Sequence, residues 1–324
     1  MITGLLTSVW VAAIAIIIGF VLLVYGADWL VDGASAVAQR LGVSELVIGL
    51  TVVAFGTSMP EFIVSTLAAI EHNSEIAITN ILGSNAINTF IILGCTALIC
   101  PVASQLSCRR FDIPLNLVAG VVVFVYTYFF GQLDVWAGLI LLCFFVWFMV
   151  HSLRTAKQPS VAAATAETPS HQPMRPVTSY LLILAGLVFL VLGGEAVVRG
   201  ATSIAQRLGV SDAIIGLTIV ALGTSLPELF TSCVAAYKHN CDLALGNIVG
   251  SNIFNVFFIL GVGALIHPMP AYTGLILDAG MVVLSIIMVM LFVYTTQKHE
   301  IKRWHGAMLL LTYAIYLSYR IYTL

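Results

Sequence analysis

The sequence predicts an all-α polytopic membrane protein with ten transmembrane helices, arranged as two inverted five-helix repeats in which helices two and seven are broken. Composition indicates the class, because 60% of the 324 residues are hydrophobic and only 9% are charged, whereas a soluble domain has about 25% charged residues. Apolar runs of roughly 20 residues, the length that crosses a bilayer, recur along the whole chain. A net charge of −2 without a long basic run argues against a nucleic-acid partner.

The predicted spans follow from hydropathy in chain order. The first apolar run has no basic flank before it and exceeds the core of a signal peptide, so we expect it to remain in the mature protein as a membrane span. The ten predicted spans cover residues 8–31, 43–70, 75–100, 114–131, 134–153, 179–206, 210–237, 242–266, 273–295 and 305–322.

One polar stretch, residues 155–178, separates the spans into two sets of five. It is rich in Ala, Pro, Ser and Thr and low in aromatic residues, which is typical of a flexible linker. The sequence therefore predicts an N-terminal five-helix repeat (1–154), a linker loop (155–178) and a C-terminal five-helix repeat (179–324).

The two halves also share sequence. QRLGVSELVIGLTVVAFGTSMPEFI (39–63) and QRLGVSDAIIGLTIVALGTSLPELF (206–230) agree at 17 of 25 positions, and the same offset aligns GSNAINTFIILG (83–94) with GSNIFNVFFILG (250–261). Because five is odd, the second copy enters the membrane from the opposite face, as in the inverted repeats of secondary transporters. Duplication of a purely structural unit is the alternative, but it does not explain why the best-matched residues are polar.

The placement of basic residues predicts the orientation. With the N-terminus outside, ten of the 13 Lys and Arg residues face the cytoplasm and three face outside, as the positive-inside rule expects. We therefore expect a multi-pass protein of the cell (inner) membrane, with both termini outside and the 155–178 loop in the cytoplasm.

The motif GTSMPE in the second span places polar groups at membrane depth. Pro60 has no N–H, so the carbonyl of Gly56 loses its helical partner. Freed carbonyls, the hydroxyls of Thr57 and Ser58 and the carboxylate of Glu61 are hard oxygen donors, which suit calcium or sodium rather than soft metals.

A second copy of this motif occurs in the seventh span, at Gly223, Thr224, Ser225, Pro227 and Glu228. Inversion of the repeat would bring both copies near the midplane. An ionisable residue there costs roughly 2.5–3.5 kcal/mol on insertion scales, and by default indicates a functional site. A helix kink with a protonated or hydrogen-bonded glutamate is the alternative interpretation, and its symmetric repetition argues against it.

Two further polar pairs occur in the GSNxxN motifs. Ser84 and Asn88 stand four residues apart on one helix face, as do Ser251 and Asn255. Such pairs are interhelical hydrogen-bond partners, ion ligands or both.

Asp28 and Glu195 occupy equivalent positions near the ends of spans one and six. We expect pairing or contact with water there, with a role in lining an ion pathway as the alternative.

With GTS(M/L)PE followed by GSNxxN, twice and over nearly the whole chain, the sequence resembles the sodium/calcium exchangers of the cation/calcium antiporter superfamily, in particular the prokaryotic branch. The resemblance implies ten helices, with broken helices two and seven packed against three and eight. It also implies four central cation sites, one favouring calcium and the others sodium or water.

The resemblance assigns ligands by motif position. It makes Glu61 and Glu228 the principal calcium ligands, joined by oxygens of Thr57 and Thr224. The sodium sites would be completed by the hydroxyls of Ser58, Ser84, Ser225 and Ser251 and the backbone oxygens of Ala54 and Ala221. Asn88 and Asn255 would complete the central set.

Asn255 stands where some relatives carry Asp, so the central charge is −2 rather than −3. This resembles the potassium-independent exchangers and argues against potassium co-transport. One calcium or two sodium ions neutralise such a site, so the three-for-one exchange typical of the family does not follow from these residues.

The resemblance thus implies an antiporter that exchanges sodium for calcium by alternating access, with spans one and six sliding as a gate. It implies no enzyme activity and no cofactor. Ca²⁺ and Na⁺ would be substrates, the lipid bilayer the surroundings, and no obligate protein partner is indicated. A proton-coupled calcium antiporter and a passive cation channel remain the alternatives.

Overall fold

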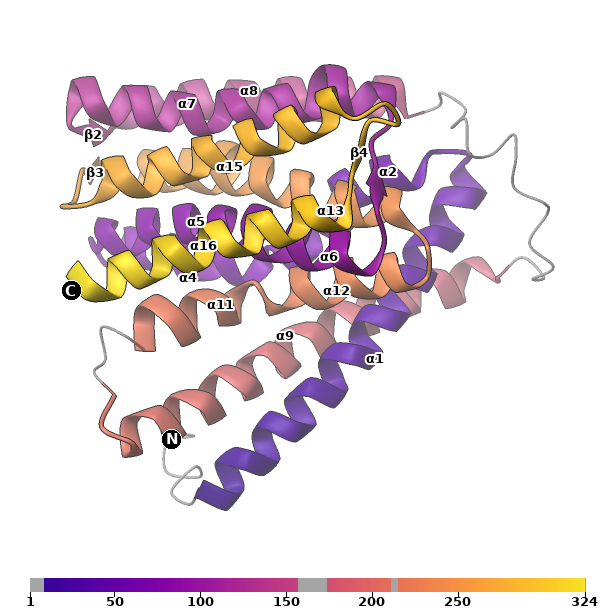
Figure 1. The fold of residues 1–324 in the computed structure, drawn as a ribbon, viewed down its shortest axis with the longest axis horizontal. Coiled ribbons are helices and arrows are strands. Elements are labelled where there is room, and N and C mark those ends of the chain that lie inside the picture. Colours follow the sequence, from indigo (N-terminus) through magenta and orange to yellow (C-terminus); the bar gives the residue numbers. More distant parts are fainter. Residues whose placement is uncertain (1–8, 157–173, 211–214, 324) are drawn as a thin grey trace.

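The computed structural model describes residues 9–156, 174–210 and 215–323, and they are almost entirely helical (Figure 1). Most of the predicted linker and part of the predicted span 210–237 lie outside the described residues. The helices are α1 (Val9–Leu41), α2 (Glu45–Ile48), α3 (Ala54–Thr57), α4 (Met59–Ile70), α5 (Ser74–Ile87), α6 (Leu93–Ile99), α7 (Ile113–Phe130), α8 (Val135–Thr155), α9 (Pro176–Arg207), α11 (Ala221–Thr224), α12 (Leu226–Tyr237), α13 (Cys241–Ile253), α14 (Gly261–Ile266), α15 (Leu275–Thr295) and α16 (Arg303–Thr323).

Several spans contain short π-helical segments, which continue one helix into the next. They are η1 (Gly49–Val53), η2 (Asn88–Ile92), η3 (Cys108–Asp112), η5 (Gly216–Val220) and η6 (Phe254–Leu260). Two antiparallel strand pairs join loops at opposite ends of the molecule: β1 (Val102–Ala103) with β4 (Glu300–Ile301), and β2 (Gln132–Leu133) with β3 (Met269–Pro270).

Seven continuous helical runs in the described part of the chain are long and apolar enough to cross a bilayer. Two bent helix pairs raise the number to nine, and they are the predicted broken spans two and seven. The remaining helix, α16, has 21 residues but carries Arg303, His305, Arg320 and several tyrosines, so a tenth span stays a prediction.

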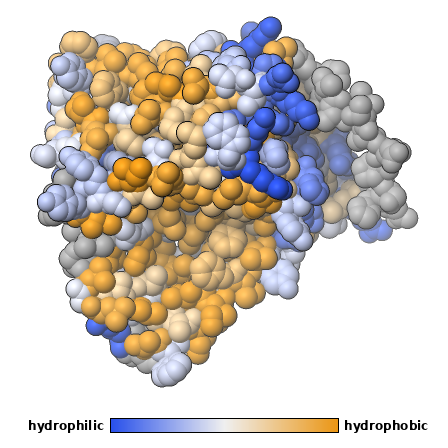
Figure 2. Space-filling model, in the orientation of Figure 1, coloured by the Kyte–Doolittle hydropathy of each residue, from blue (hydrophilic) through white to orange (hydrophobic). Residues whose placement is uncertain are grey.

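The surface matches a chain that sits in lipid. Figure 2 shows hydrophobic side chains over most of the visible face, with hydrophilic residues gathered towards one end. Large apolar side chains such as Trp10 and Phe129 are 80% and 72% exposed, which is unfavourable in water but not against acyl chains.

The core is built around α5 and α13, the most buried of the long runs. Helices α7, α8, α15 and α16 run roughly parallel to them, whereas α1 and α9 cross the bundle at a slant (Figure 1). This arrangement places the GTSxPE and GSNxxN motifs in the interior.

Helices α1 and α9 are antiparallel and in unusually close contact. A Cβ on Gly193 would lie 2.7 Å from the carbonyl oxygen of Gly19, and a Cβ on Gly19 would lie 2.7 Å from that of Gly193. Small residues recur every seventh position on both contacting faces: Ala12, Gly19, Gly26 and Gly33 on α1, and Ser179, Gly186, Gly193 and Gly200 on α9. Small residues let membrane helices approach backbone to backbone, so α1 and α9 form one tightly fastened pair.

Candidate cation site

Each broken span bends at the serine of its GTSxPE motif, by 50° in the first copy and 55° in the second. Ser58 and Ser225 stand at the breaks with nearly equal backbone angles (φ −82°, ψ 10° and φ −89°, ψ 6°). Pro60 and Pro227 lie in the first turn of the following helix, where the missing N–H leaves no bond unmade. The break predicted from Gly and Pro is therefore confirmed in both copies.

The two glutamates are fully buried, and a serine from the opposite half contacts each of them. Ser225 Oγ donates to Glu61 Oε1 (3.2 Å), and Ser58 Oγ donates to Glu228 Oε1 (2.8 Å). Ser84 Oγ, from the neighbouring α5, also donates to Glu61 Oε1 (3.3 Å). The carboxylates of the two halves thus share one site, held by reciprocal contacts across the molecule.

The motif threonines follow the same crossed pattern. Thr224 faces the Glu61 carboxylate and Thr57 faces that of Glu228. Each threonine hydroxyl also lies 3.4 Å from a backbone carbonyl of its own half, that of Ala54 for Thr57 and that of Ala221 for Thr224. The backbone oxygens expected beside the site are therefore adjacent to it.

Several buried oxygens of the site have no hydrogen-bond partner among the described residues. They are Glu61 Oε2, Glu228 Oε2, Ser251 Oγ, Asn88 Oδ1 and Asn255 Oδ1. Buried polar atoms are almost always paired, so unpaired oxygens on both glutamates and on the motif residues are the atoms that a bound cation could satisfy. Oxygen donors of this kind suit sodium and calcium.

The two asparagines of the expected ligand set differ in their hydrogen bonds. Asn255 Nδ2 donates to Asn85 Oδ1 (3.0 Å), whereas neither polar atom of the Asn88 side chain has a partner among the described residues. Asn255 is therefore oriented by hydrogen bonding, while Asn88 is not.

Two asparagines that sequence reasoning missed position the glutamate helices. Asn80 Nδ2 lies 3.4 Å from the carbonyl oxygen of Glu61, and Asn247 Nδ2 lies 3.4 Å from that of Glu228. Each also donates to a serine of the same helix, at 2.9 Å and 3.0 Å. The sequence repeat could have revealed them, because Asn80 in NILGSN (80–85) aligns with Asn247 in NIVGSN (247–252).

The two carboxyl groups of the site have no basic partner among the described residues. Neither Glu61 nor Glu228 has a Lys, Arg or His partner within 4.0 Å in the part of the chain that the structure describes. Two buried carboxylates without a basic partner are costly unless cations or protons neutralise them.

Asp28 and Glu195 lie away from the site and are paired, as expected. Asp28 lies 2.7 Å from Lys238 of the α12–α13 turn, while Glu195 pairs with Arg199 one turn along its own helix.

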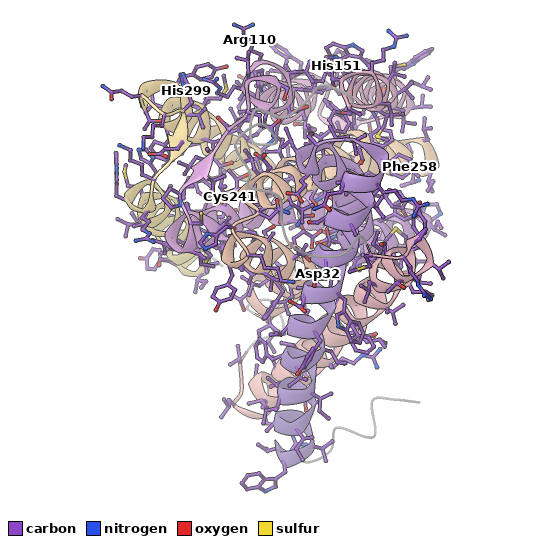
Figure 3. The ribbon with its side chains drawn as sticks, turned by 90° about the vertical axis from the view of Figure 1, so that its right-hand side faces the viewer. Asp32, Arg110, His151, Cys241, Phe258 and His299 are labelled. Carbon is purple, nitrogen blue, oxygen red and sulfur yellow. The ribbon has the colours of Figure 1, made fainter. Side chains whose placement is uncertain are left out.

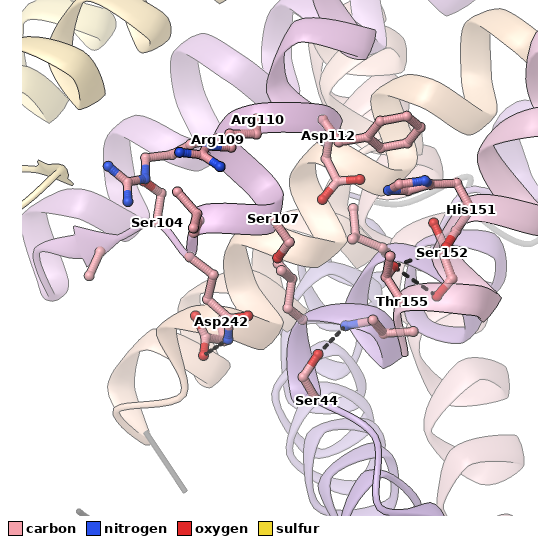
Figure 4. A pocket seen from close by; sticks show the side chains of 17 residues that line it. Ser44, Ser104, Ser107, Arg109, Arg110, Asp112, His151, Ser152, Thr155 and Asp242 are labelled. Carbon is pink, nitrogen blue, oxygen red and sulfur yellow. Dashed lines mark hydrogen bonds between the residues drawn. The ribbon is translucent and has the colours of Figure 1, made fainter. Parts of the chain in front are cut away.

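The large cavity that the structure describes lies at one end of the bundle rather than at the glutamates. It has a volume of about 840 Å³ and lies between α2, η3, the end of α8 and the start of α13 (Figure 4). Arg109, Arg110, Asp112, His151 and Asp242 line it, and Asp112 is buried there without a hydrogen bond to any described residue. The cation site is thus enclosed and separate from this cavity.

Comparison with known proteins agrees with this geometry. The family profile described as "Sodium/calcium exchanger protein" matches residues 11–154 and 178–322. The chain belongs to the sodium/calcium exchanger family. Within it, the chain is similar to the sodium/calcium exchanger MaX1 of Methanosarcina acetivorans (31% identity, covering 93% of this chain and 96% of MaX1). It is also similar to the inner membrane protein YrbG of Escherichia coli strain K12 (39% identity, 79% and 80% covered).

A structure of the sodium-calcium exchanger NCX_Mj soaked with Na⁺ and Sr²⁺ superposes with a TM-score of 0.83 at 32% identity. The match covers 96% of this chain and 99% of that one. This member of the sodium/calcium exchanger family is therefore a multi-pass membrane protein with the helical fold of that exchanger.

Proposed function

We propose that the protein exchanges sodium for calcium across the membrane by alternating access, with both ions binding at the Glu61–Glu228 site. The observation that carries the proposal is the enclosed pair of carboxylates, each contacted by hydroxyls of the opposite half and neither paired with a base. Sodium and calcium would compete for the same oxygen atoms. Because either one calcium or two sodium ions neutralise this site, binding of one ion type displaces the other, and antiport follows.

The ligand roles divide by charge. Glu61 and Glu228 would bind calcium through their carboxylates, assisted by Thr57 and Thr224. The neutral oxygens would complete sodium sites, with Asn88 and Asn255 at the centre: Ser58, Ser84, Ser225, Ser251 and the backbone oxygens of Ala54 and Ala221. The unpaired Oε2 atoms of both glutamates support this assignment.

The proposed topology has ten spans, with α16 as the tenth, in two inverted halves (1–154 and 179–324). The described chain ends lie on one side of the molecule and the helix ends that flank the linker on the other, which supports an odd number of crossings in each half (Figure 1). The bias of basic residues places the linker in the cytoplasm and both termini outside.

Proton coupling is the second candidate function, because buried carboxylates hydrogen-bonded to serine could release calcium by taking up protons. It uses the same glutamates and differs only in the driving ion.

Calcium-45 uptake into proteoliposomes loaded with sodium tests the proposal. We expect uptake that requires the outward sodium gradient and collapses when sodium is equal on both sides. Uptake indifferent to sodium but driven by a pH gradient would establish proton coupling instead. Flux without stimulation by the opposite ion would indicate a channel.

A further inference from the structure

Residues of the turn between α12 and α13 form ion pairs and a hydrogen bond with α1. Lys238 Nζ lies 2.6 Å from Asp32 and 2.7 Å from Asp28, and Asn240 Nδ2 donates to Ser35 Oγ (3.0 Å). Figure 3 looks at this end of the molecule and shows Asp32 on α1 below the start of α13. These contacts link a helix of the slanted pair to the helix that carries Glu228.

The repeat places corresponding residues at the other end of the molecule, with two charges exchanged. Counting 167 residues along the sequence, Lys238 corresponds to Glu71, Asp32 to Arg199, Asn240 to Asn73 and Ser35 to Thr202. A lysine that faces two carboxylates, Asp28 and Asp32, thus becomes a glutamate that corresponds to a partner set of Glu195 and Arg199. Of these two, Arg199 has the charge that complements Glu71.

Only the first pair is formed. Arg199 pairs instead with Glu195 of its own helix. Among the described residues Glu71 makes no ion pair, and the buried Thr202 hydroxyl has no partner.

The turns themselves do not explain this difference, since their backbones agree. His72 and His239 have φ of 59° and 60°, and the N–H of the following asparagine bonds back to a helix carbonyl at 2.7 Å and 2.8 Å.

The described helix contacts beside the site also differ between the two halves. A Cβ on Gly250 of α13 would lie 2.6 Å from the carbonyl oxygen of Leu50, so α13 and the first broken span are in backbone contact. Among the described residues, a Cβ on the corresponding Gly83 of α5 would meet nothing within 4 Å. The described contacts of these two glycines beside the site therefore differ between the halves.

We propose that these two residue sets are alternating latches, which hold the α1–α9 pair against the core at one end of the molecule at a time. The first latch, Lys238 with Asp28 and Asp32, is closed in this structure. The second, Glu71 with Arg199, closes in the opposite state. Because α1 and α9 are fastened through their glycine faces, drawing one end of the pair onto the core moves the other end away.

This inference rests on the alternating access of the proposed function and adds positioning residues that do not touch the ions. The latches determine from which side of the membrane the site is accessible, whereas the glutamates determine which ions bind there.

A double-mutant cycle tests the open latch. Glu71→Gln and Arg199→Gln should each slow exchange, by roughly two- to fivefold as for partly exposed ion pairs, and the double variant should be no slower than either. The charge-reversed pair Glu71→Arg with Arg199→Glu should recover most of the rate. Glu75→Gln, an exposed carboxylate one turn beyond Glu71, is the matched control and should leave the rate unchanged.

A distance measurement tests the closed latch without depending on transport. Spin labels at exposed Glu75 and Leu208, in a variant whose native cysteines are replaced, report the gap at the Glu71 end. Lys238→Gln should move the label distances towards a shorter population, whereas Lys238→Arg should not.

Two results would overturn the latch proposal. One is an unchanged distance between the labels in Lys238→Gln. The other is additive effects of Glu71→Gln and Arg199→Gln on the free energy of activation for exchange. Failure of sodium exchange alone would contradict the proposed function, but the label distances would still decide about the latch.

Discussion

The centre of the molecule and its two ends are built from the same repeat, yet they differ in symmetry. At the centre, Ser58 bonds Glu228 and Ser225 bonds Glu61, so the halves make matching contacts. At the ends, Lys238 holds α1 while its counterpart Glu71 holds nothing among the described residues. Contacts that match in both halves favour neither orientation of the slanted pair over the other. The centre also has unequal contacts, because Ser84 donates to Glu61 while Ser251 Oγ has no partner among the described residues. The ion pairs at the ends differ more strongly, which is why the proposed latches assign the choice of state to them.

The largest effect is expected at the symmetric centre. Glu61→Gln or Glu228→Gln should abolish calcium transport, by more than about a hundredfold, because a neutral amide cannot replace the carboxylate beside a divalent cation. In ion-free buffer the same variants should melt no lower than wild type, since each removes a buried charge without a partner. Calcium-45 flux and thermal unfolding measure the two effects. Transport retained in both variants would contradict the site.

The contact between α1 and α9 should be the next most sensitive. Gly193→Ala places a Cβ 2.7 Å from the Gly19 carbonyl oxygen, whereas Gly194→Ala, one residue on, meets Gly223 only at 3.6 Å. We expect the first variant to lose roughly 1–3 kcal/mol of stability by overpacking, and the second to remain near wild type. Melting of the purified proteins compares them, and equal melting temperatures would mean that the close approach is unimportant.

The helix packing beside the site can be compared between the two halves through the equivalent glycines Gly250 and Gly83. Gly250→Ala should destabilise the protein, because its Cβ meets the Leu50 carbonyl at 2.6 Å. Gly83→Ala should stabilise the described state by about 0.5–1 kcal/mol, since alanine is the better helix former and no atom of the described residues lies within 4 Å of its Cβ. If the ends exchange packing during transport, Gly83→Ala should nevertheless slow exchange. Unimpaired exchange in Gly83→Ala would show that α5 does not come into such close backbone contact beside the site during transport.

The smallest effect concerns the start of α8. Asp134 caps this helix, and its hydrogen bond from the Tyr126 hydroxyl holds the carboxyl pKa below its ordinary 3.8. A lowered pKa means that the stabilisation is present above pH 4 and is lost as the pH falls through the folded-state value. Asp134→Asn keeps a capping side chain, so its melting temperature should depend less on pH below 4. Parallel curves for both proteins across that range would contradict this.

Much of the site was readable from the sequence because its chemistry is local and repeated. Gly and Pro around Ser58 fix where the helix breaks, and Glu61 beside that break predicts a hard-oxygen cation site. The offset of 167 residues then transferred each prediction from the first half of the chain to the second. Asn80 and Asn247 were missed, because no local sequence pattern shows which neighbouring helix a buried asparagine will bond.

The sequence by itself thus determined the membrane class, the broken spans and the hard-oxygen donors, since hydropathy and backbone chemistry act over a few residues. Only the tertiary structure decided that hydroxyls cross between the halves, that α1 and α9 meet through glycines seven residues apart, and that one latch is closed. These depend on which helix faces which. The sequence encodes different charges at the two ends, but only the packing of α1 against the turn after α12 shows which of the two ion pairs is formed.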